Sequence, residues 1–326
     1  MMTTRERFLT TMSFGTPDRI PYFEEGIRKD VLKAWKKQGL SSKSELSKMF
    51  TTDHFEEIAP ELGPIPDLVS WPSSVNELKL LSNRLKPDLS DRVARDWEKR
   101  VRNKNRNNQV VFYRAHRGLF LSLGVHRWDR FIDVIALLLE DPVYVHRVLT
   151  IQAEFAAIML ENILNNIQID AVIFGEPIGG NEGPLISPKM YEDYVLRSFD
   201  PIFRIINSYN IKNLIVRTYA NVRILIPRFL KYGINGIWAC ETNVEKMDYK
   251  DLRYEFGRDL RLIGGIDLDA LRMGKEAIRR EIEDKVPPLI AEGGYIPLAD
   301  GRIRSDVSFE NYVYYRHLLE EVTKVS

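Results

Sequence analysis

Short apolar segments that end in a polar or charged residue recur along the chain, with stretches of helical periodicity between them. Each segment is four to six apolar or small residues long and rich in Ile and Val. Segments of this length are too short for helices and are typical of strands buried on both faces, as in a parallel sheet. The clearest are Ala171–Glu176, Asn213–Arg217, Gly236–Glu241, Leu260–Asp267 and Gly294–Asp300.

Three further segments extend the pattern toward the amino end, at Ile20–Glu25, Asp53–Ile58 and Gln109–Arg114. Eight strands alternating with helices predict a single-domain (β/α)8 barrel over residues 1–326, with an N-terminal helical extension. An open doubly wound sheet is the alternative, but no glycine fingerprint follows the first predicted strand.

Helical periodicity and capping residues predict what lies between the strands. The expected helices are Arg5–Met12, Asp30–Gln38, Lys189–Asn207, Val222–Tyr232, Lys250–Phe256, Asp269–Glu292 and Ser308–Val322, with long helices over residues 131–168. The proline-rich residues 60–106 predict an inserted hairpin or irregular region. Arg92–Arg106 holds seven Arg or Lys against two acids, which indicates a solvated helix and turn more than a docking patch.

Composition narrows the class of protein without naming a function. The chain is 44% hydrophobic and 29% charged, and its net charge of +1 gives no electrostatic reason to expect nucleic acid or a membrane as a partner. The single cysteine, Cys240, suits a reducing compartment. No signal peptide and no uninterrupted apolar run of about 18 residues is present, so we expect a cytoplasmic protein.

In a barrel, residues just past the carboxyl ends of the strands build the active site. At this position Glu176 is a candidate for a general base, a binder of a cationic group or a metal ligand. Alternatively, it has only a structural role, in a salt bridge to Arg217. Arg217 can clamp an anion or be paired structurally, and Tyr219 can donate a hydrogen bond. Asn221 is either a substrate contact or the cap of the next helix.

Further polar residues at the predicted strand ends complete a mouth of balanced charge, which suits a small zwitterionic or polar substrate better than a polyanion. They are Tyr22, Glu24, Arg28, His116, Glu241, Asp267, Asp300 and Arg302. A metal site made by Glu176, Cys240 and Glu241 is a weaker alternative, because it mixes soft and hard ligands. By default Cys240 is a small core residue.

Several segments in order resemble the uroporphyrinogen decarboxylase superfamily over nearly the whole chain. They are Arg5–Arg19, Asn181–Pro188, Asn221–Gly236, Leu262–Asp267, Gly274–Pro297 and Asp306–Tyr315. The resemblance implies a (β/α)8 barrel and either of two activities. One branch decarboxylates porphyrinogens without a cofactor. The other moves methyl groups between a small molecule and a corrinoid protein, and many of its members use zinc.

The chain departs from both branches at the positions that carry chemistry. The decarboxylases' N-terminal Arg-Gln-Ala-Gly-Arg motif is missing. The His-x-Cys zinc motif after the fifth strand is replaced by Arg217-Thr218-Tyr219, and the third ligand position reads Ala299. Arginine stays protonated and does not bind metals, so we expect no zinc site of the family's type.

The resemblance implies a methyltransferase that works with a small molecule or a pterin carrier and a separate corrinoid protein, without zinc. The chain lacks the Asp-x-His-x-x-Gly corrinoid motif, so a partner would carry the corrinoid. Glu176 would act as acid or base while Arg217, Tyr219 and Asp300 position the substrate. A metal-independent decarboxylase and a non-catalytic binding subunit remain alternatives. Tyr312, Tyr314 and Tyr315 suggest a homodimer contact or, equally, a core role.

Overall fold

The computed structural model describes residues 1–106, 109–126, 129–180, 182–240 and 247–324. Seven strands form one parallel sheet in the order β1-β2-β3-β6-β7-β8-β9. They are β1 Phe55–Ile58, β2 Val110–His116, β3 Ala171–Gly175, β6 Asn213–Thr218, β7 Gly236–Ala239, β8 Arg261–Ile266 and β9 Tyr295–Ala299. In the loop after β3, β4 (Gly179–Gly180) and β5 (Gly183–Pro184) form a small antiparallel pair.

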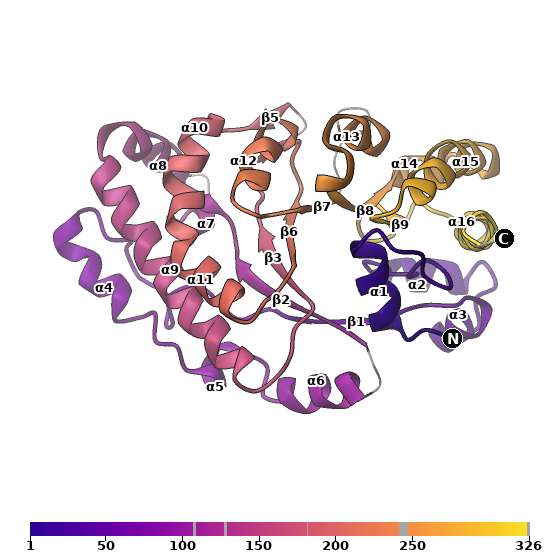
Figure 1. Cartoon of the computed structure of the whole chain (residues 1–326), viewed down its shortest axis with the longest axis horizontal. Helices are drawn as coiled ribbons and strands as arrows, with labels where there is room; N and C mark the ends of the chain where they lie inside the picture. The colour runs from indigo at the N-terminus through magenta and orange to yellow at the C-terminus, as the bar shows by residue number, and fades with distance from the viewer. Residues whose placement is uncertain (107–108, 127–128, 181, 241–246, 325–326) are drawn as a thin grey trace.

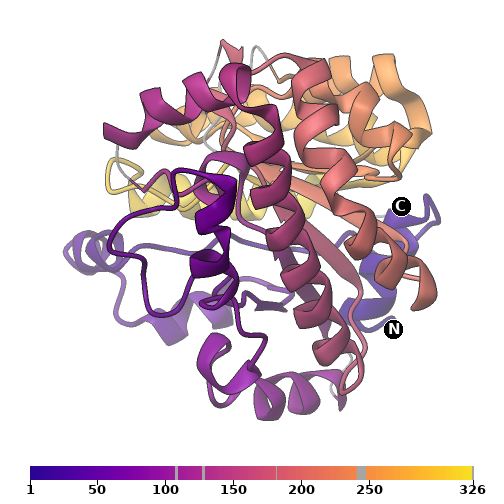
Figure 2. The same cartoon turned by 90° about the vertical axis from the view of Figure 1, so that its left-hand side faces the viewer.

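Helices cover the outer face of this curled sheet (Figure 1). They are α1 Thr4–Met12, α2 Lys29–Lys36, α3 Lys43–Met49, α4 Leu78–Ser82, α5 Leu89–Arg92, α6 Trp97–Arg106, α7 Leu119–Ser122, α8 Asp129–Glu140, α9 Pro142–Leu164, α10 Pro188–Tyr191, α11 Asp200–Ser208, α12 Ile226–Lys231, α13 Tyr249–Phe256, α14 Leu268–Arg272, α15 Lys275–Glu292 and α16 Phe309–Val322. The long helix α9 runs along the outside of the strands (Figure 2).

Seven of the eight predicted strands are confirmed, but the segment Ile20–Glu25 is not a strand. The Tyr22 amide donates to the Asp53 carboxylate at 2.9 Å, and the Tyr22 carbonyl accepts from the Asp53 amide at 2.9 Å. One isolated parallel bridge, Ile27 to Ile303, joins the segment to the chain after β9. These contacts take the place of a regular ladder, so the curled sheet is consistent with a TIM-like barrel whose first strand is irregular.

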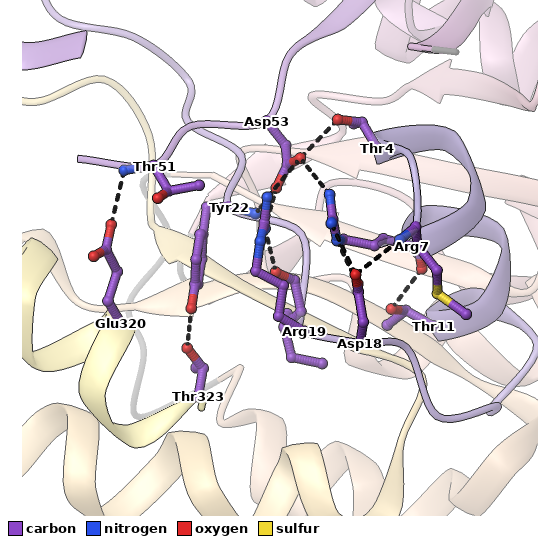
Figure 3. Close-up of polar contacts among 12 residues, drawn as sticks. Thr4, Arg7, Thr11, Asp18, Arg19, Tyr22, Thr51, Asp53, Glu320 and Thr323 are labelled. Atoms are coloured by element: carbon purple, nitrogen blue, oxygen red, sulfur yellow. Dashed lines mark hydrogen bonds and ion pairs between the residues drawn. The ribbon is translucent and has the colours of Figure 1, made fainter. Parts of the chain in front are cut away.

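The predicted N-terminal helix is α1, and the chain after it is fixed by a buried carboxylate (Figure 3). Asp53 accepts hydrogen bonds from Arg19 at 2.5 Å and Thr4 at 2.6 Å, and lies 3.5 Å from Arg7. Burial would raise the pKa of Asp53, but the hydrogen bonds from Arg19 and Thr4 hold it below the usual value. Arg7 also pairs with Asp18 at 2.6 Å. This network attaches α1 to the chain that leads into β1.

Side chains alternate between two cores, one on each face of the curled sheet. The smaller core is enclosed by the sheet and includes Phe8 and Met12 of α1 with Phe23, Phe112 and Trp238. The larger core lies between the sheet and the surrounding helices. By length and composition alone α9 could cross a bilayer, but 61% of its most apolar window is buried in the protein, as expected of a core helix.

Two predicted helices are interrupted in the structure. Lys189–Asn207 divides into α10, a π-helical turn at Glu192–Leu196, a 3₁₀ turn at Arg197–Phe199 and then α11. Asp269–Glu292 divides into α14 and α15 at Gly274, whose φ of +104° cannot continue a helix.

Residues 60–106, all of which the structure describes, contain short helices and irregular chain but no strand, so the inserted hairpin is absent. The basic run lies largely in α6, where Arg100 is 3.4 Å from Glu56 of β1. Near the other end, Tyr312 and Tyr315 of α16 are buried within the chain, which confirms their core role. A homodimer stays a prediction.

Candidate functional site: a polar layer inside the sheet

Six polar side chains line the inner face of the sheet toward the carboxyl ends of its strands. Each follows, two residues later, an apolar residue that packs in the inner core. Because residues i and i+2 of an extended chain face the same side, the polar residue also points inward. The pairs are Phe23 and Glu25, Phe55 and Glu57, Phe112 and Arg114, Ile215 and Arg217, Trp238 and Cys240, and Leu298 and Asp300. We call Glu25, Glu57, Arg114, Arg217, Cys240 and Asp300 the polar layer.

Glu57 joins the two arginines of the polar layer. Its Oε1 accepts from Nη2 of Arg114 at 2.5 Å and its Oε2 from Nη1 of Arg217 at 2.7 Å. Burial alone would raise the pKa of Glu57, but the two guanidinium groups outweigh burial and hold the pKa below its usual value. Glu57 therefore stays ionised and fixes both arginines.

Arg217 combines this ion pair with two unused donors. Its guanidinium lies 4.0 Å from the centre of the Trp238 ring, and its side chain is 11% exposed. Among the described residues, no hydrogen-bond partner contacts its buried Nε and Nη2. Buried donors without acceptors are costly, so this edge of the guanidinium is suited to receive an oxygen atom of a ligand.

Cys240 is a protonated thiol rather than a thiolate. Its Sγ donates to Oε1 of Glu25 at 3.4 Å, and the side chain is buried. Burial, followed by the charge of Glu25, raises the pKa of Cys240 well above its usual value, and Arg217 only partly opposes them. A thiol with a raised pKa is a poor nucleophile at neutral pH.

Among the side chains that the structure describes, the polar layer holds three carboxylates (Glu25, Glu57 and Asp300) and two guanidinium groups (Arg114 and Arg217). The predicted mouth of mixed charge is thus present with different members. Arg217 and Asp300, predicted to act on substrate, lie in it, and so does Cys240 of the weaker metal alternative.

Glu176 and His116 lie together on the outer side of the sheet. Glu176 is fully buried and accepts from the Leu119 amide at 3.0 Å and the Tyr191 hydroxyl at 2.9 Å, while Nε2 of His116 is 3.2 Å away. Its side chain faces away from the polar layer, because Glu176 lies an odd number of residues after Ile173, which faces inward. The alternative salt bridge from Glu176 to Arg217 is not formed, since Arg217 pairs with Glu57.

Tyr22 and Glu24 alternate with the inward-facing Phe23 and therefore point outward. The prediction that they line the mouth is wrong. The Tyr22 hydroxyl hydrogen-bonds to Thr323 at 2.7 Å (Figure 3). Glu24 accepts from Arg316 at 2.6 Å and from the Tyr312 hydroxyl at 2.8 Å, so it joins the first segment to α16.

Two other predicted contacts bond to nearby backbone. Asp267 is the N-cap of α14 and accepts from the Asp269 amide at 2.8 Å. Asn221 accepts from the Arg223 amide at 3.1 Å one residue before Val222, the N-cap of the 3₁₀ turn Arg223–Leu225.

The remaining predicted residues lie nearer the surface or cannot be placed. Tyr219 is 51% exposed, and Arg28 and Arg302 are exposed. Glu241 lies outside the described residues.

The sequence interpretation missed Glu25, Glu57 and Arg114. It chose as candidates the polar residues that end each apolar segment. Which residues face the inside of the sheet is decided by the two-residue period of a strand. The recurring signal was an aromatic or aliphatic residue followed two positions later by a charged one, as in Phe23-Glu24-Glu25 and Phe55-Glu56-Glu57.

The residues present do not fit a zinc ion of the family's type. Arg217 stands at the first ligand position and is held by Glu57, and Ala299 has no donor atom. Across the described part of the chain, no group of three or more His, Cys, Asp or Glu side chains is arranged to hold a metal. The weaker metal alternative fails for its two described members, because Glu176 and Cys240 lie on opposite faces of the sheet.

Comparison with known proteins gives a consistent family assignment. Residues 128–311, more than half of the chain, match the family model described as uroporphyrinogen decarboxylase (URO-D). A uroporphyrinogen decarboxylase from Ruthia magnifica subsp. Calyptogena magnifica is 23% identical over 201 residues, which cover 60% of this chain and 54% of that protein. The chain thus spans about half the length of this curated relative.

A solved methyltransferase from Methanosarcina mazei has the same fold over nearly the full length of both proteins. The TM-score is 0.64, the identity is 15%, and the match covers 98% of this chain and 99% of the other. With the family match over its carboxyl-terminal half and more, the chain belongs to the uroporphyrinogen decarboxylase family.

Proposed function

We propose that this protein is a methyltransferase that moves a methyl group between a small polar molecule and a corrinoid carried by a separate protein. Family membership limits the choice to the chemistry of uroporphyrinogen decarboxylase relatives, and the end-to-end likeness to a methyltransferase supports this branch. The pairing of both arginines of the polar layer with Glu57 carries the choice of branch. A cytoplasmic location belongs to the same proposal.

A layer whose two arginines are already engaged by a carboxylate is a poor site for a porphyrinogen that bears several carboxylates. Two of its five charged groups are arginines, and Glu57 neutralises part of both. A small molecule with few charges needs fewer free cationic partners than a polyanion does.

In this proposal Arg217 positions the substrate through its free Nε and Nη2 edge, and Glu57 holds Arg217 in place. Asp300 lines the layer near enough to Cys240 to act on it electrostatically, as Arg217 does. The acid–base role predicted for Glu176 is not retained, because its buried carboxylate is occupied by Leu119, Tyr191 and His116. Tyr219 contributes at most at the rim of the site, given its exposure.

The direct test supplies the purified protein with chemically reduced cobalamin and a panel of methyl donors, and follows methylcobalamin formation by absorbance. We expect formation with at least one small donor and its loss in Arg217→Met. A boiled sample and the outward-facing variant Glu56→Gln serve as controls. No methylcobalamin with any donor, either with free cobalamin or with a reduced corrinoid protein, would contradict the proposal.

A decarboxylase is the second candidate, because the curated relative carries that name. Titration with a porphyrin carboxylate separates the two activities. We expect no saturable change in the porphyrin spectrum, whereas tight binding that Arg217→Met abolishes would favour decarboxylation.

A further inference from the structure

We propose that a groove between the amino- and carboxyl-terminal parts of the chain binds an uncharged, largely apolar ring compound that carries a carbonyl oxygen. The groove has a volume of about 590 Å³, and small-molecule sites typically have volumes of roughly 300–1,000 Å³. Its walls come from the first segment, α3, the chain that leads into β1, and α16, chiefly through Glu24, Ile27, Leu46, Phe50, Phe55 and Arg316. None of the six residues of the polar layer lines it, so this site is separate from the proposed site of methyl transfer.

The groove follows from the irregular course of the first segment. The Tyr22 amide and carbonyl both bond to Asp53, at 2.9 Å each, just before β1 begins. The chain then turns toward the far side of the sheet, where the Gly26 carbonyl accepts from the Ile303 amide at 3.2 Å. β1 is the edge strand of the seven-stranded sheet and pairs with β2. A seam therefore remains between β1 and the segment that leaves it, and the groove is lined by residues of both.

The walls of the groove are apolar and partly aromatic. Leu46, Phe50 and Tyr312 are buried, while Ile27 and Phe55 are half-buried. The rings of Phe50 and Tyr312 lie 5.8 Å apart, edge to face. Aromatic walls pack well against a flat ring, so these side chains favour a ring compound over a flexible polar ligand.

The two carboxylates that line the groove are already paired within the protein. Glu24 accepts from Arg316 at 2.6 Å and from the Tyr312 hydroxyl at 2.8 Å. Asp53 accepts from Arg19 and Thr4 (Figure 3). A charged ligand would lose its hydration in the groove and gain no buried counter-charge in return, whereas an uncharged ligand avoids this cost.

Arg316 has one hydrogen-bond donor left over. Its side chain is 2% exposed, and its Nη1 and Nη2 donate to Glu24 at 2.6 Å and to the Thr51 carbonyl at 2.7 Å. Its Nε is buried and has no hydrogen-bond partner among the described residues. A buried donor without an acceptor is costly, and a ligand oxygen bonded to Nε would remove that cost. A carbonyl oxygen accepts without bringing a hydrogen that needs a partner of its own.

Equilibrium dialysis with three naphthalenes of similar shape tests the inference. 2-Acetylnaphthalene carries a ketone, 2-isopropenylnaphthalene has a methylene group in place of the carbonyl oxygen, and 2-naphthoate carries a carboxylate. Burial of apolar surface alone would favour the hydrocarbon. We expect the ketone to bind at least about threefold more tightly than either of the other two. Tighter binding of the hydrocarbon or the carboxylate, or no binding of the ketone, would overturn the inference.

Nitrogen-15 NMR of the arginine side chains locates the contact in the unmodified protein. The Arg316 Nε–H signal should shift on titration with the ketone and stay in place with the hydrocarbon. A ketone that binds without moving this signal would contradict the assignment of Nε as its donor.

Variants test the same contact by affinity. Arg316→Lys keeps a positive charge beside Glu24 and removes Nε, so its preference for the ketone over the hydrocarbon should disappear. Thr52→Trp places a large side chain in the groove and should abolish ketone binding, whereas the exposed Val75→Trp should not. Melting curves show whether each variant is folded, and the NMR titration carries the test if one is not. Unchanged ketone binding in folded Thr52→Trp would show that the ligand lies elsewhere and overturn the inference.

Discussion

At the scale of single residues, neighbouring positions in this chain have different surroundings. Glu24 is bound by Arg316 and Tyr312 between the sheet and α16, whereas Glu25 lies inside the sheet beside Cys240. Glu56 faces Arg100 of α6, and Glu57 joins Arg114 to Arg217. The side of the strand, rather than residue type, decides which carboxylates can reach a substrate.

Replacing Glu57 by Gln should destabilise the protein by about 3 kcal/mol, because the largely buried Arg217 loses its counter-charge and the partly exposed Arg114 loses the same partner. In the control Glu56→Gln, the arginine that loses its partner, Arg100, is 45% exposed, so this variant should cost less than the change at Glu57. Urea denaturation of both variants measures the difference. Equal losses would show that the Glu57 pairs contribute no more than a pair with an exposed arginine.

Asp18 makes a pH-dependent contribution to stability. Hydrogen bonding to Arg7 lowers its pKa from 3.8 to about 2. A depressed folded-state pKa stabilises the protein above the unfolded value and loses that stabilisation as pH falls from 3.8 toward about 2.

Asp18→Asn should therefore lower the urea midpoint at neutral pH and have a shrinking effect below pH 3.8. Comparing midpoints from neutral pH down to the most acidic folded condition checks the prediction. A difference that stays constant across this range would contradict the pairing with Arg7.

At the scale of elements, the five clearest strands were predictable because their apolar runs are buried on both faces. The first strand was not, because its register depends on distant contacts. Tyr22 bonds to Asp53 instead of entering a ladder, and Pro21 has no amide hydrogen to donate. The carboxylate 31 residues away could not be inferred from the local pattern.

The segment between β1 and α6 depends on one buried arginine. The guanidinium of Arg92 donates to four carbonyls, those of Glu61, Gly63, Arg84 and Lys86, and lies 4.5 Å from the centre of the Phe155 ring. It thereby holds irregular chain that has few other regular hydrogen bonds.

Arg92→Gln should lower the unfolding free energy by about 3 kcal/mol and expose residues 60–92 to protease, because several buried carbonyls lose charged donors. The exposed Arg95→Gln is the matched control and should leave both properties unchanged. Mass spectrometry of early proteolytic fragments identifies the cut sites. Cleavage elsewhere first would show that Arg92 does not hold this segment.

At the scale of the whole molecule, the two ends of the chain meet where the first strand is irregular. Tyr22 contacts Thr323, Glu24 contacts Arg316, and α2 packs against α16 through Trp35 and Tyr312 (Figure 1). A groove of about 590 Å³ follows this junction. Closure of the sheet therefore depends on side chains of the first segment more than on its backbone.

Phe23 is the inward side chain of that segment and lies 5.3 Å from the ring of Phe55. Phe23→Ala should cost about 3–5 kcal/mol by leaving a cavity in the inner core. The exposed Tyr254→Ala is a control expected to change stability by less than about 0.5 kcal/mol. A small loss for Phe23→Ala, measured by urea denaturation, would mean that the inner core does not need the first segment.

The parallel architecture could be predicted from the sequence, whereas only two of the predicted catalytic or substrate-binding residues, Arg217 and Asp300, lie in the polar layer. Strand ends are visible as changes from apolar to polar residues. Whether a residue faces inward or outward depends on where its strand begins. At His116 the alternation is reversed by a register shift after Arg114. Site prediction therefore needs the register of each strand as well as its position.

The most direct test of the account compares methylcobalamin formation by Asp300→Asn and by Glu56→Gln with that of the unmodified protein, using the best methyl donor. If the polar layer is the site of methyl transfer, Asp300→Asn should lower kcat/KM at least about tenfold, and Glu56→Gln should stay within about twofold. Equal rates for all three proteins, or no methylcobalamin from any of them, would contradict the account.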